Sequence, residues 1–392
     1  MSDTRVTRPV GRMGALERSL LGVPVVQIPR LLPGLLAVVA LAWFSIWLSE
    51  FVGVTLLGFD KTPISAVMLA ILLGLVVGTV LRLPRAFEPG LRFAVKKVLR
   101  LGIILLGIRL TIFDVLRLGV YGVPIVILCV LGALLFTTYS NRWLHLPPRL
   151  GTLIAVGTSI CGVSAIVATG PAIDAEDEEV AYAVAVITIF GLAATVVYPY
   201  LANVVFAGQA LNAGLFLGTA VHDTSQVVGA GKVYADVFAA PLALDVATVT
   251  KLVRNVFMAA VIPTMAFLSC RRTSQGDACD SRRVSFFRLL PLFVAGFVAL
   301  AVARSIGDAG LNAGGRAFGL WDGATWAAIH ATVKGWAENL MVVALAGVGL
   351  STDFRTFKGL GLKPFLVGLA AALAVGVVSY LAISLLGRFV TL

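Results

Sequence analysis

Long apolar stretches recur along the whole chain and constrain its fold more than any other feature. Each runs for about 20 residues, which is the length that a helix needs to cross a hydrocarbon core of about 30 Å. Of the 392 residues, 59% are hydrophobic and only 13% are charged, too few charges to cover a water-soluble domain of this size. The apolar runs are continuous and do not alternate, which argues against a barrel. The sequence therefore predicts an all-α polytopic membrane protein.

We expect about eleven transmembrane helices, at residues 31–49, 63–81, 98–116, 120–140, 150–171, 180–205, 210–231, 243–268, 286–304, 324–350 and 364–386. With eleven crossings, the basic N-terminal tail and the basic loops after the second, fourth, eighth and tenth spans all lie on one side, and the acidic cluster at 174–179 lies on the other. Because basic residues accumulate on cytoplasmic loops, we expect a cytoplasmic N-terminus and an external C-terminus. The net charge of +11 has the same explanation, and no basic–aromatic pattern indicates a nucleic-acid partner.

Two regions are expected: a cytoplasmic tail at residues 1–30, without a signal-peptide cleavage site, and a single membrane domain at 31–392. An odd span count fits an extra N-terminal helix followed by two five-helix halves, 63–205 and 210–386, as an inverted repeat. In that frame the fifth span pairs with the tenth. A competing similarity joins GTSICGVSAIVATG (157–170) to GTAVHDTSQVVGAG (218–231). It would place parallel spans in register, unless one segment is a re-entrant hairpin.

The seventh span contains five consecutive polar residues, 222–226, between glycines and alanines. An ionised side chain at the bilayer centre costs roughly 2.5–3.5 kcal/mol on insertion scales, so such groups need partners or a water-lined cavity. Glycines such as Gly218 favour a helix break, which exposes backbone groups that can hold an ion. Hydrogen bonding between helices through Thr224, Ser225 and Gln226 is the alternative explanation.

The eighth span places Thr248, Lys251 and Asn255 on one helix face, with Arg254 at its edge. A point charge, a planar guanidinium and an amide within one turn suit an oxyanion. Snorkelling of both cations towards an interface is the alternative.

The tenth span carries His330, Lys334 and Glu338 as one stripe, and Gly335 could allow a break beside them. A charged break at mid-depth is typical of transport sites, although Lys334 and Glu338 could simply neutralise each other. Arg109, in the third span, can pair with Asp223 or Glu338 in space, or it can contact substrate.

The fifth span has hydroxyls and glycines but no charge, so Ser159 would bind through its hydroxyl, and Gly157 and Gly162 would permit a break. Without a local basic neighbour to form a thiolate, Cys161 is expected to be a packing residue. No CxxC pair supports a metal site or a disulfide framework.

Five stretches together resemble one family: GTSICGVSAIVATGPAI, AVAVITIFGLAATVVYP, GTAVHDTSQVVGAG, ATVTKLVRNVFMA and ALAGVGLST. They are similar to YeiH-type bacterial inner-membrane proteins, proposed sulfate exporters, over nearly all of the chain from about residue 35. The resemblance implies a plasma-membrane secondary transporter with inverted repeats and crossing discontinuous helices. It implies no catalytic residues.

We therefore expect a secondary active transporter that moves a small anion (sulfate, a sulfonate or a small carboxylate) by alternating access. No nucleotide site is visible, so a proton or sodium gradient would drive it. Its partners would be the anion, the coupling ion, the bilayer and, in a homodimer, a second copy; no cofactor or metal is expected. The predicted substrate-binding residues are Ser159, Thr224, Ser225, Gln226, Lys251, Arg254, Asn255 and Lys334. The predicted coupling residues are His222, Asp223 and Glu338, because burial and neighbouring charge move the titration of such groups. The predicted helix-break glycines are Gly157, Gly162, Gly218 and Gly335.

Two other functions fit some of these residues. A cation–proton antiporter would use Asp223, although the spans hold more cations than anions. An intramembrane enzyme is disfavoured, because His222 and Asp223 point in different directions on a helix and no nucleophile elbow or HExxH motif is present.

Overall fold

The computed structural model describes residues 25–58, 64–81, 83–272, 292–352 and 362–390. Within these ranges the chain is almost entirely helical and has no β-strand. Seven of its helices are long and apolar enough to cross a membrane, and three shorter apolar helices accompany them. The prediction of an all-α polytopic membrane protein is confirmed. The count of eleven spans and the division into halves at 63–205 and 210–386 stay predictions, and most of the expected tail, 1–24, lies outside the described residues.

The helices follow the expected apolar stretches, with some differences in their ends. In the first part of the chain they are α1 (Leu32–Glu50), α2 (Ala66–Leu81), α3 (Glu88–Phe93), α4 (Leu99–Leu106) and α5 (Ile112–Trp143). The central helices are α6 (Pro148–Ser159), α7 (Val163–Thr169), α8 (Asp177–Val205), α9 (Ala210–Ala220), α10 (Thr224–Val237) and α11 (Pro241–Val256). The last are α12 (Met258–Arg272), α14 (Leu292–Gly314), α15 (Gly323–Leu350) and α16 (Leu362–Leu386).

Helices α3 and α4 belong to one continuous helix, which we call the 88–109 rod. A π-helical turn at Ala94–Val98 joins them, and a 3-10 turn at Gly107–Arg109 ends the rod. Thr111 then starts α5: its hydroxyl accepts from the Asp114 amide at 3.2 Å, and the Asp114 carboxylate accepts from the Thr111 amide at 3.0 Å. This capping box begins the next helix at Ile112. The expected boundary between residues 116 and 120 was therefore wrong.

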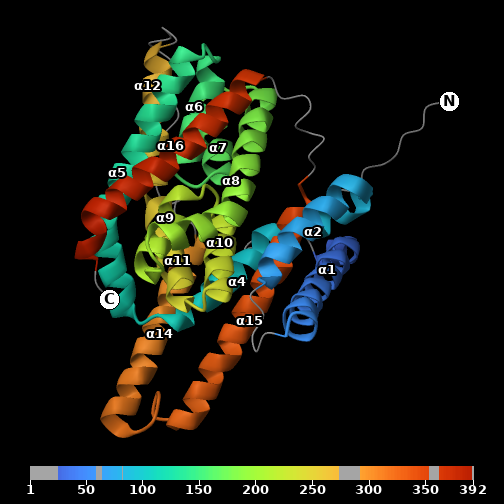
Figure 1. The fold of residues 1–392 in the computed structure, drawn as a ribbon, viewed down its shortest axis with the longest axis vertical. Helices are drawn as coiled ribbons and strands as arrows, with labels where there is room; N and C mark the ends of the chain where they lie inside the picture. Colours follow the sequence, from blue (N-terminus) through green and yellow to red (C-terminus); the bar gives the residue numbers. More distant parts are fainter. Residues whose placement is uncertain (1–24, 59–63, 82, 273–291, 353–361, 391–392) are drawn as a thin grey trace, which may run out of the picture.

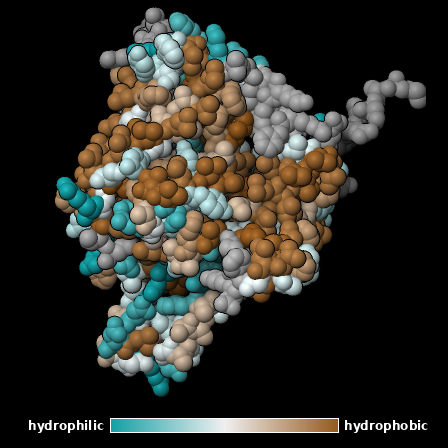
Figure 2. All heavy atoms as spheres, viewed as in Figure 1, coloured by the Kyte–Doolittle hydropathy of each residue, from teal (hydrophilic) through white to brown (hydrophobic). Residues whose placement is uncertain are grey.

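The helices form two groups (Figure 1). The panel consists of α1, α2, the 88–109 rod and α15, in which α15 packs against both α2 and α4. The hairpin body consists of α5 to α12 and α16, with α11 packed between α9, α10 and α5. Helix α14 contacts both α4 and α5 and so links the two groups. Apolar residues cover much of the outer face along α16 and over α1, as a lipid-facing surface requires (Figure 2).

Small residues allow close packing within the panel. A Cβ added at Gly74 would lie 2.9 Å from the Ala346 carbonyl oxygen, and one added at Gly78 would lie 2.6 Å from that of Leu350. Gly74 and Gly78 have the GxxxG spacing that lets two membrane helices approach backbone to backbone. The contact between α2 and α15 therefore depends on both glycines.

The expected seventh span does not cross the molecule but turns back on itself. Both Gly218 of α9 and Gly231 of α10 pack against Ala247 of α11, although thirteen residues of helix would separate them by about 20 Å. The chain therefore returns between α9 and α10, at residues 221–223. This segment is a re-entrant hairpin, the lower hairpin in Figure 1.

The expected fifth span is a second re-entrant hairpin, the upper one in Figure 1. A Cβ added at Gly157 of α6 would meet Ile166 of α7 at 2.7 Å, and α6 and α7 both contact α12. Because α11 and α12 follow one another in one long helix, the two hairpins approach its centre from opposite ends. The turns occupy matching places in the two similar stretches: α7 starts at Val163, and α10 starts 61 residues later at Thr224.

Helix α15 is continuous from Gly323 to Leu350, so the predicted helix break at Gly335 was wrong. A Cβ at Gly335 would meet nothing within 4 Å, so this glycine marks open surface and not a close approach. The turn at Gly162 therefore has its structural counterpart at residues 221–223 and not in α15.

Candidate functional site

The tips of the two hairpins meet beside α11. Gly162 has φ +67°, and a Cβ added there would lie 3.3 Å from both the Cα and the Cβ of Asp223. Glycine is favoured at this position because a left-handed backbone and a close neighbour coincide. The predicted break at Gly162 is thus present, as the turn of a hairpin, whereas Gly218 lies inside α9 before the turn at 221–223 and allows close packing against Ala247 and Thr250. Gly157 lies inside α6 and makes room for the returning α7.

Lys251 of α11 ties both tips together. Its Nζ donates to the carbonyls of Ile160 at 2.8 Å, of Val221 at 3.1 Å and of His222. These carbonyls follow the ends of α6 and α9, where four carbonyls of each helix lack an intrahelical donor and the helix dipole is negative. The ammonium is fully buried, and all its described hydrogen bonds go to the backbone.

Arg254, one turn further along α11, also donates hydrogen bonds to backbone carbonyls of both hairpins. Its Nε donates to Ser159 O at 2.7 Å, its Nη1 to Thr219 O at 2.5 Å and to Val221 O at 3.3 Å, and its Nη2 to Thr158 O. The guanidinium is also fully buried. Among the described residues neither cation forms an ion pair with a carboxylate. Cations at the C-terminal ends of α6 and α9 compensate the dipoles of both helices.

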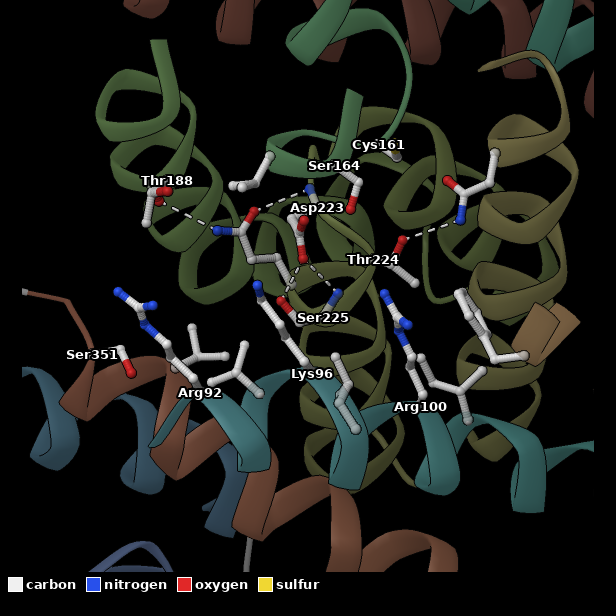
Figure 3. Close-up of a pocket in the computed structure, with 18 of the residues that line it drawn as sticks. Arg92, Lys96, Arg100, Cys161, Ser164, Thr188, Asp223, Thr224, Ser225 and Ser351 are labelled. Carbon is white, nitrogen blue, oxygen red and sulfur yellow. Dashed lines mark hydrogen bonds between the residues drawn. The ribbon is translucent and has the colours of Figure 1, made fainter. Parts of the chain in front are cut away.

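A cavity of about 680 Å³ lies on the other side of the tips, between the hairpin body and the panel (Figure 3). Arg92, Lys96 and Arg100 rise from the 88–109 rod and point across the cavity towards the tips. Their spacing of four residues puts all three on one face of the rod. Arg92 pairs with Glu88, whereas Lys96 and Arg100 form no ion pair within the described part of the chain. Arg100 instead lies 5.8 Å from the ring centroid of Phe293.

The opposite wall is the start of α10. Asp223 is the N-cap: its carboxylate accepts from the Ser225 amide at 2.9 Å and from the Ser225 hydroxyl at 2.5 Å. Gln226 completes the capping box by accepting from the Asp223 amide at 3.1 Å, and its amide donates to Thr188 O at 3.3 Å. Asp223 makes no ion pair within the described residues, although three cations line the same cavity.

Asn255 connects α11 to this wall. Its Nδ2 donates to the Thr224 hydroxyl at 3.2 Å. The side chain is only 3% exposed and lines the cavity, yet its Oδ1 is buried without a described partner. An unpaired buried acceptor costs about 1–3 kcal/mol.

The structure brings together part of the predicted site. Five predicted residues line the cavity: Asp223, Thr224, Ser225, Gln226 and Asn255. Six do not: Ser159, His222, Lys251, Arg254, Lys334 and Glu338. His222 is fully buried, and neither ring nitrogen has a hydrogen-bond partner among the described residues. Ser159 donates its hydroxyl to Val156 O, and Lys334 is exposed on α15.

Glu338 belongs to a separate ion network, which also supplies the partner of Arg109. The Arg109 guanidinium binds Asp245 through two bonds of 2.6 and 3.2 Å and Glu338 at 3.1 Å. Lys232 lies 3.5 Å from Glu338 and pairs with Asp236, which accepts from Ser65 at 3.0 Å. The network joins the rod and α15 of the panel to α10 and α11 of the hairpin body.

Sequence reasoning missed the three cavity cations and Asp245. Arg92 and Lys96 were counted among the charges of a cytoplasmic loop, because apolarity was taken as the mark of a span. The spacing of Arg92, Lys96 and Arg100, with apolar residues at 95, 99 and 103, is the signal that could have identified a helix lining a cavity.

Known proteins are similar to this chain over most of its length. The family model "Conserved hypothetical protein 698" matches residues 33–368. A UPF0324 membrane protein of Streptococcus agalactiae is 32% identical over 335 residues, covering 85% of this chain and 94% of its own length. The chain belongs to the UPF0324 membrane protein family. The resemblance to YeiH-type proteins is thereby confirmed, because these belong to the same family.

Other UPF0324 relatives come from other bacteria. One from Fusobacterium nucleatum is 29% identical over 321 residues, covering 81% of this chain and 90% of its own. One from Clostridium tetani is 29% identical over 369 residues, covering 91% and 97%. These relatives are called membrane proteins, in agreement with the apolar helices of this chain.

Proposed function

We propose that this UPF0324 protein is a secondary active transporter of a small anion. The observation that carries the proposal is the cavity in which Arg92, Lys96 and Arg100 face the start of α10 at the meeting point of two re-entrant hairpins. Re-entrant segments within a membrane are tolerated where they line a polar cavity. Half-helix ends at mid-depth are a recurrent way of building ion and substrate sites in transporters.

The charges of the cavity favour an anion. With Arg92 neutralised by Glu88, Lys96 and Arg100 outnumber the single carboxylate Asp223. Charge-assisted hydrogen bonds to guanidinium and ammonium groups suit sulfate, sulfonate and carboxylate oxygens. Hydroxyls of Ser164 and Thr224 can supply further donors.

Lys251 and Arg254 act in this proposal as positioning residues and not as substrate ligands. They hold the carbonyl ends of α6 and α9 together behind the cavity. This leaves the positive, N-terminal end of α10 directed at the cavity, where an anion is favoured.

Alternating access would move the hairpin body relative to the panel. The cavity separates the two groups near Arg92 and Lys96, while the Arg109–Asp245–Glu338 network joins them at the far end of the rod. Seventeen residues of helix separate Arg92 from Arg109, or about 25 Å. In the proposed cycle, this arrangement would be the state that is open at one end and closed at the other.

Asp223 is the residue that we propose for coupling. Its carboxylate lines the same cavity and would repel an anion bound at Lys96 and Arg100, so neutralising that charge with a proton or a bound cation would favour anion binding. The gradient would be one of protons or sodium, and the transport cycle would include no chemical conversion.

We also propose a bacterial inner membrane, with the N-terminus cytoplasmic and the C-terminus external. Two hairpins in place of two crossings leave both ends where the basic loops predict them. They move the acidic cluster at 174–179 to the cytoplasmic side. The cavity would then open to the cytoplasm, on the side of the basic residues that precede the rod.

A thermal-shift screen of purified protein tests the proposal. Sulfate, sulfite, thiosulfate, taurine, glutamate and citrate would be compared with chloride at fixed ionic strength, with sodium and pH varied separately. A ligand at about 100 times its Kd stabilises the native state by about 2.7 kcal/mol. We expect stabilisation by one anion class, loss of it in Lys96→Gln and retention in Arg117→Gln, an exposed control on α5. Stabilisation by sodium or pH alone would favour the cation–proton antiporter that uses Asp223.

A further inference from the structure

The cavity is larger than an inorganic anion needs. Its volume of about 680 Å³ lies within the range of roughly 300–1,000 Å³ that is typical of pockets for organic ligands. A five-atom anion on Lys96 would leave most of this space to water.

Much of the cavity wall is apolar. Six of its apolar residues come from four helical elements other than the hairpin tips, namely Val95, Leu99, Ile103, Met258, Phe293 and Val348. Leu99, Ile103, Met258 and Val348 are each less than 9% exposed, so they form a packed wall and not scattered surface contacts.

The apolar wall and the cations lie next to each other on the same helix. Residues 92, 96 and 100 form one row along the 88–109 rod, and residues 95, 99 and 103 form the adjacent row. Arg100 marks the boundary, because its guanidinium lies against the Phe293 ring. A ligand whose charged group contacts the first row would lay its remaining atoms along the second.

We propose that the substrate is an amphipathic organic anion, in which a sulfonate or carboxylate head is joined to an apolar group of several carbons. Lys96 and Arg100 bind the head, and the apolar group packs against Phe293, Met258 and Val348. The proposal rests on the proposed function of the cavity as an anion site. It differs from inorganic sulfate in requiring the apolar wall.

Calorimetric titration with linear alkanesulfonates, from methanesulfonate to hexanesulfonate, tests this inference. Sulfate serves as the reference, and the protein is held in nanodiscs at constant ionic strength. Burial of each added methylene should tighten the Kd about fourfold until the wall is covered. Sulfate should bind more weakly than hexanesulfonate.

Matched variants test whether the dependence of Kd on chain length arises at the apolar wall of the cavity. Phe293→Asn should flatten the dependence on chain length, whereas Phe389→Asn should not, because Phe389 also lies against an arginine but outside the cavity. Val348→Thr is nearly isosteric and should flatten it partly, which keeps the test valid if Phe293→Asn fails to fold. Lys96→Gln should weaken all members of the series by a similar factor.

Three other results would overturn either this inference or the proposed function. Sulfate binding as tightly as hexanesulfonate, with no dependence on chain length, would overturn this inference and leave the anion site intact. Affinities unchanged in Lys96→Gln, together with a chain-length dependence unchanged in Phe293→Asn, would show partition into lipid and would also overturn it. Absence of binding by every anion would instead overturn the proposed function.

Discussion

Gly162 and Asp223 occupy equivalent positions at the tips of the two hairpins, where each precedes the first residue of a returning helix. They are also neighbours in space, since a Cβ on Gly162 would lie 3.3 Å from the Asp223 Cβ. The small residue in one tip makes room for the charged residue in the other. This contact fixes the relative position of the two hairpins beside the cavity.

Gly162→Ala tests this contact. Alanine would need a positive φ and would crowd Asp223, so we expect a loss of about 1–3 kcal/mol in unfolding free energy. Gly122→Ala is the matched control, because a Cβ there meets nothing within 4 Å. Equal melting temperatures for the two variants would show that the tips are not packed as described.

Lys251→Met separates a positioning role from ligand binding. Removing the ammonium leaves the Ile160 and His222 carbonyls without a described donor, while Val221 O keeps its bond from Arg254. An unsatisfied buried acceptor costs about 1–3 kcal/mol, so we expect destabilisation of at least that size with little change in anion Kd for the protein that folds. Lys334→Met, on the exposed face of α15, should leave both quantities unchanged. A Lys251→Met protein of normal stability that binds no anion would instead make Lys251 a substrate ligand.

The Arg109–Asp245 pair should contribute to stability as a unit. A double-mutant cycle of Arg109→Gln and Asp245→Asn, measured by thermal unfolding, should give a coupling energy of about 0.5–3 kcal/mol, because the pair is bidentate and largely buried. The same cycle on Arg92 and Glu88, a mostly exposed pair, should give about 0.5 kcal/mol or less. Additive changes in unfolding free energy for Arg109→Gln and Asp245→Asn would show that no ionic contact joins the two residues at the end of the 88–109 rod.

Asp223→Asn should uncouple transport from the gradient without unfolding the protein. Asparagine remains a good N-cap, so α10 should start at the same residue. The carboxylate charge that opposes anion binding in the cavity is removed. We expect anion binding to persist and its dependence on pH or sodium to disappear. Asp322→Asn, at the N-cap of α15, is the control. Unaltered coupling in Asp223→Asn would assign the coupling ion to another residue.

Hydropathy predicted the membrane class and most helix positions, because apolar length is a local property of the sequence. It could not distinguish a crossing from a hairpin: α9 and α10 together are as long as a span, and only their shared contact with Ala247 reveals the return. Composition also could not assign roles to cations. Lys251 is buried against helix ends, whereas Lys96, counted with a loop, faces the cavity.

The most direct test of the account is a solid-supported membrane recording of charge movement in reconstituted protein. Rapid jumps of hexanesulfonate, sulfate and chloride would be applied to the wild type, to Lys96→Gln and to the control Arg117→Gln. The account predicts anion-specific currents in the wild type and the control and none in Lys96→Gln. Identical currents in all three proteins, or none with any anion, would contradict the assignment of the Arg92–Lys96–Arg100 cavity as an anion transport site.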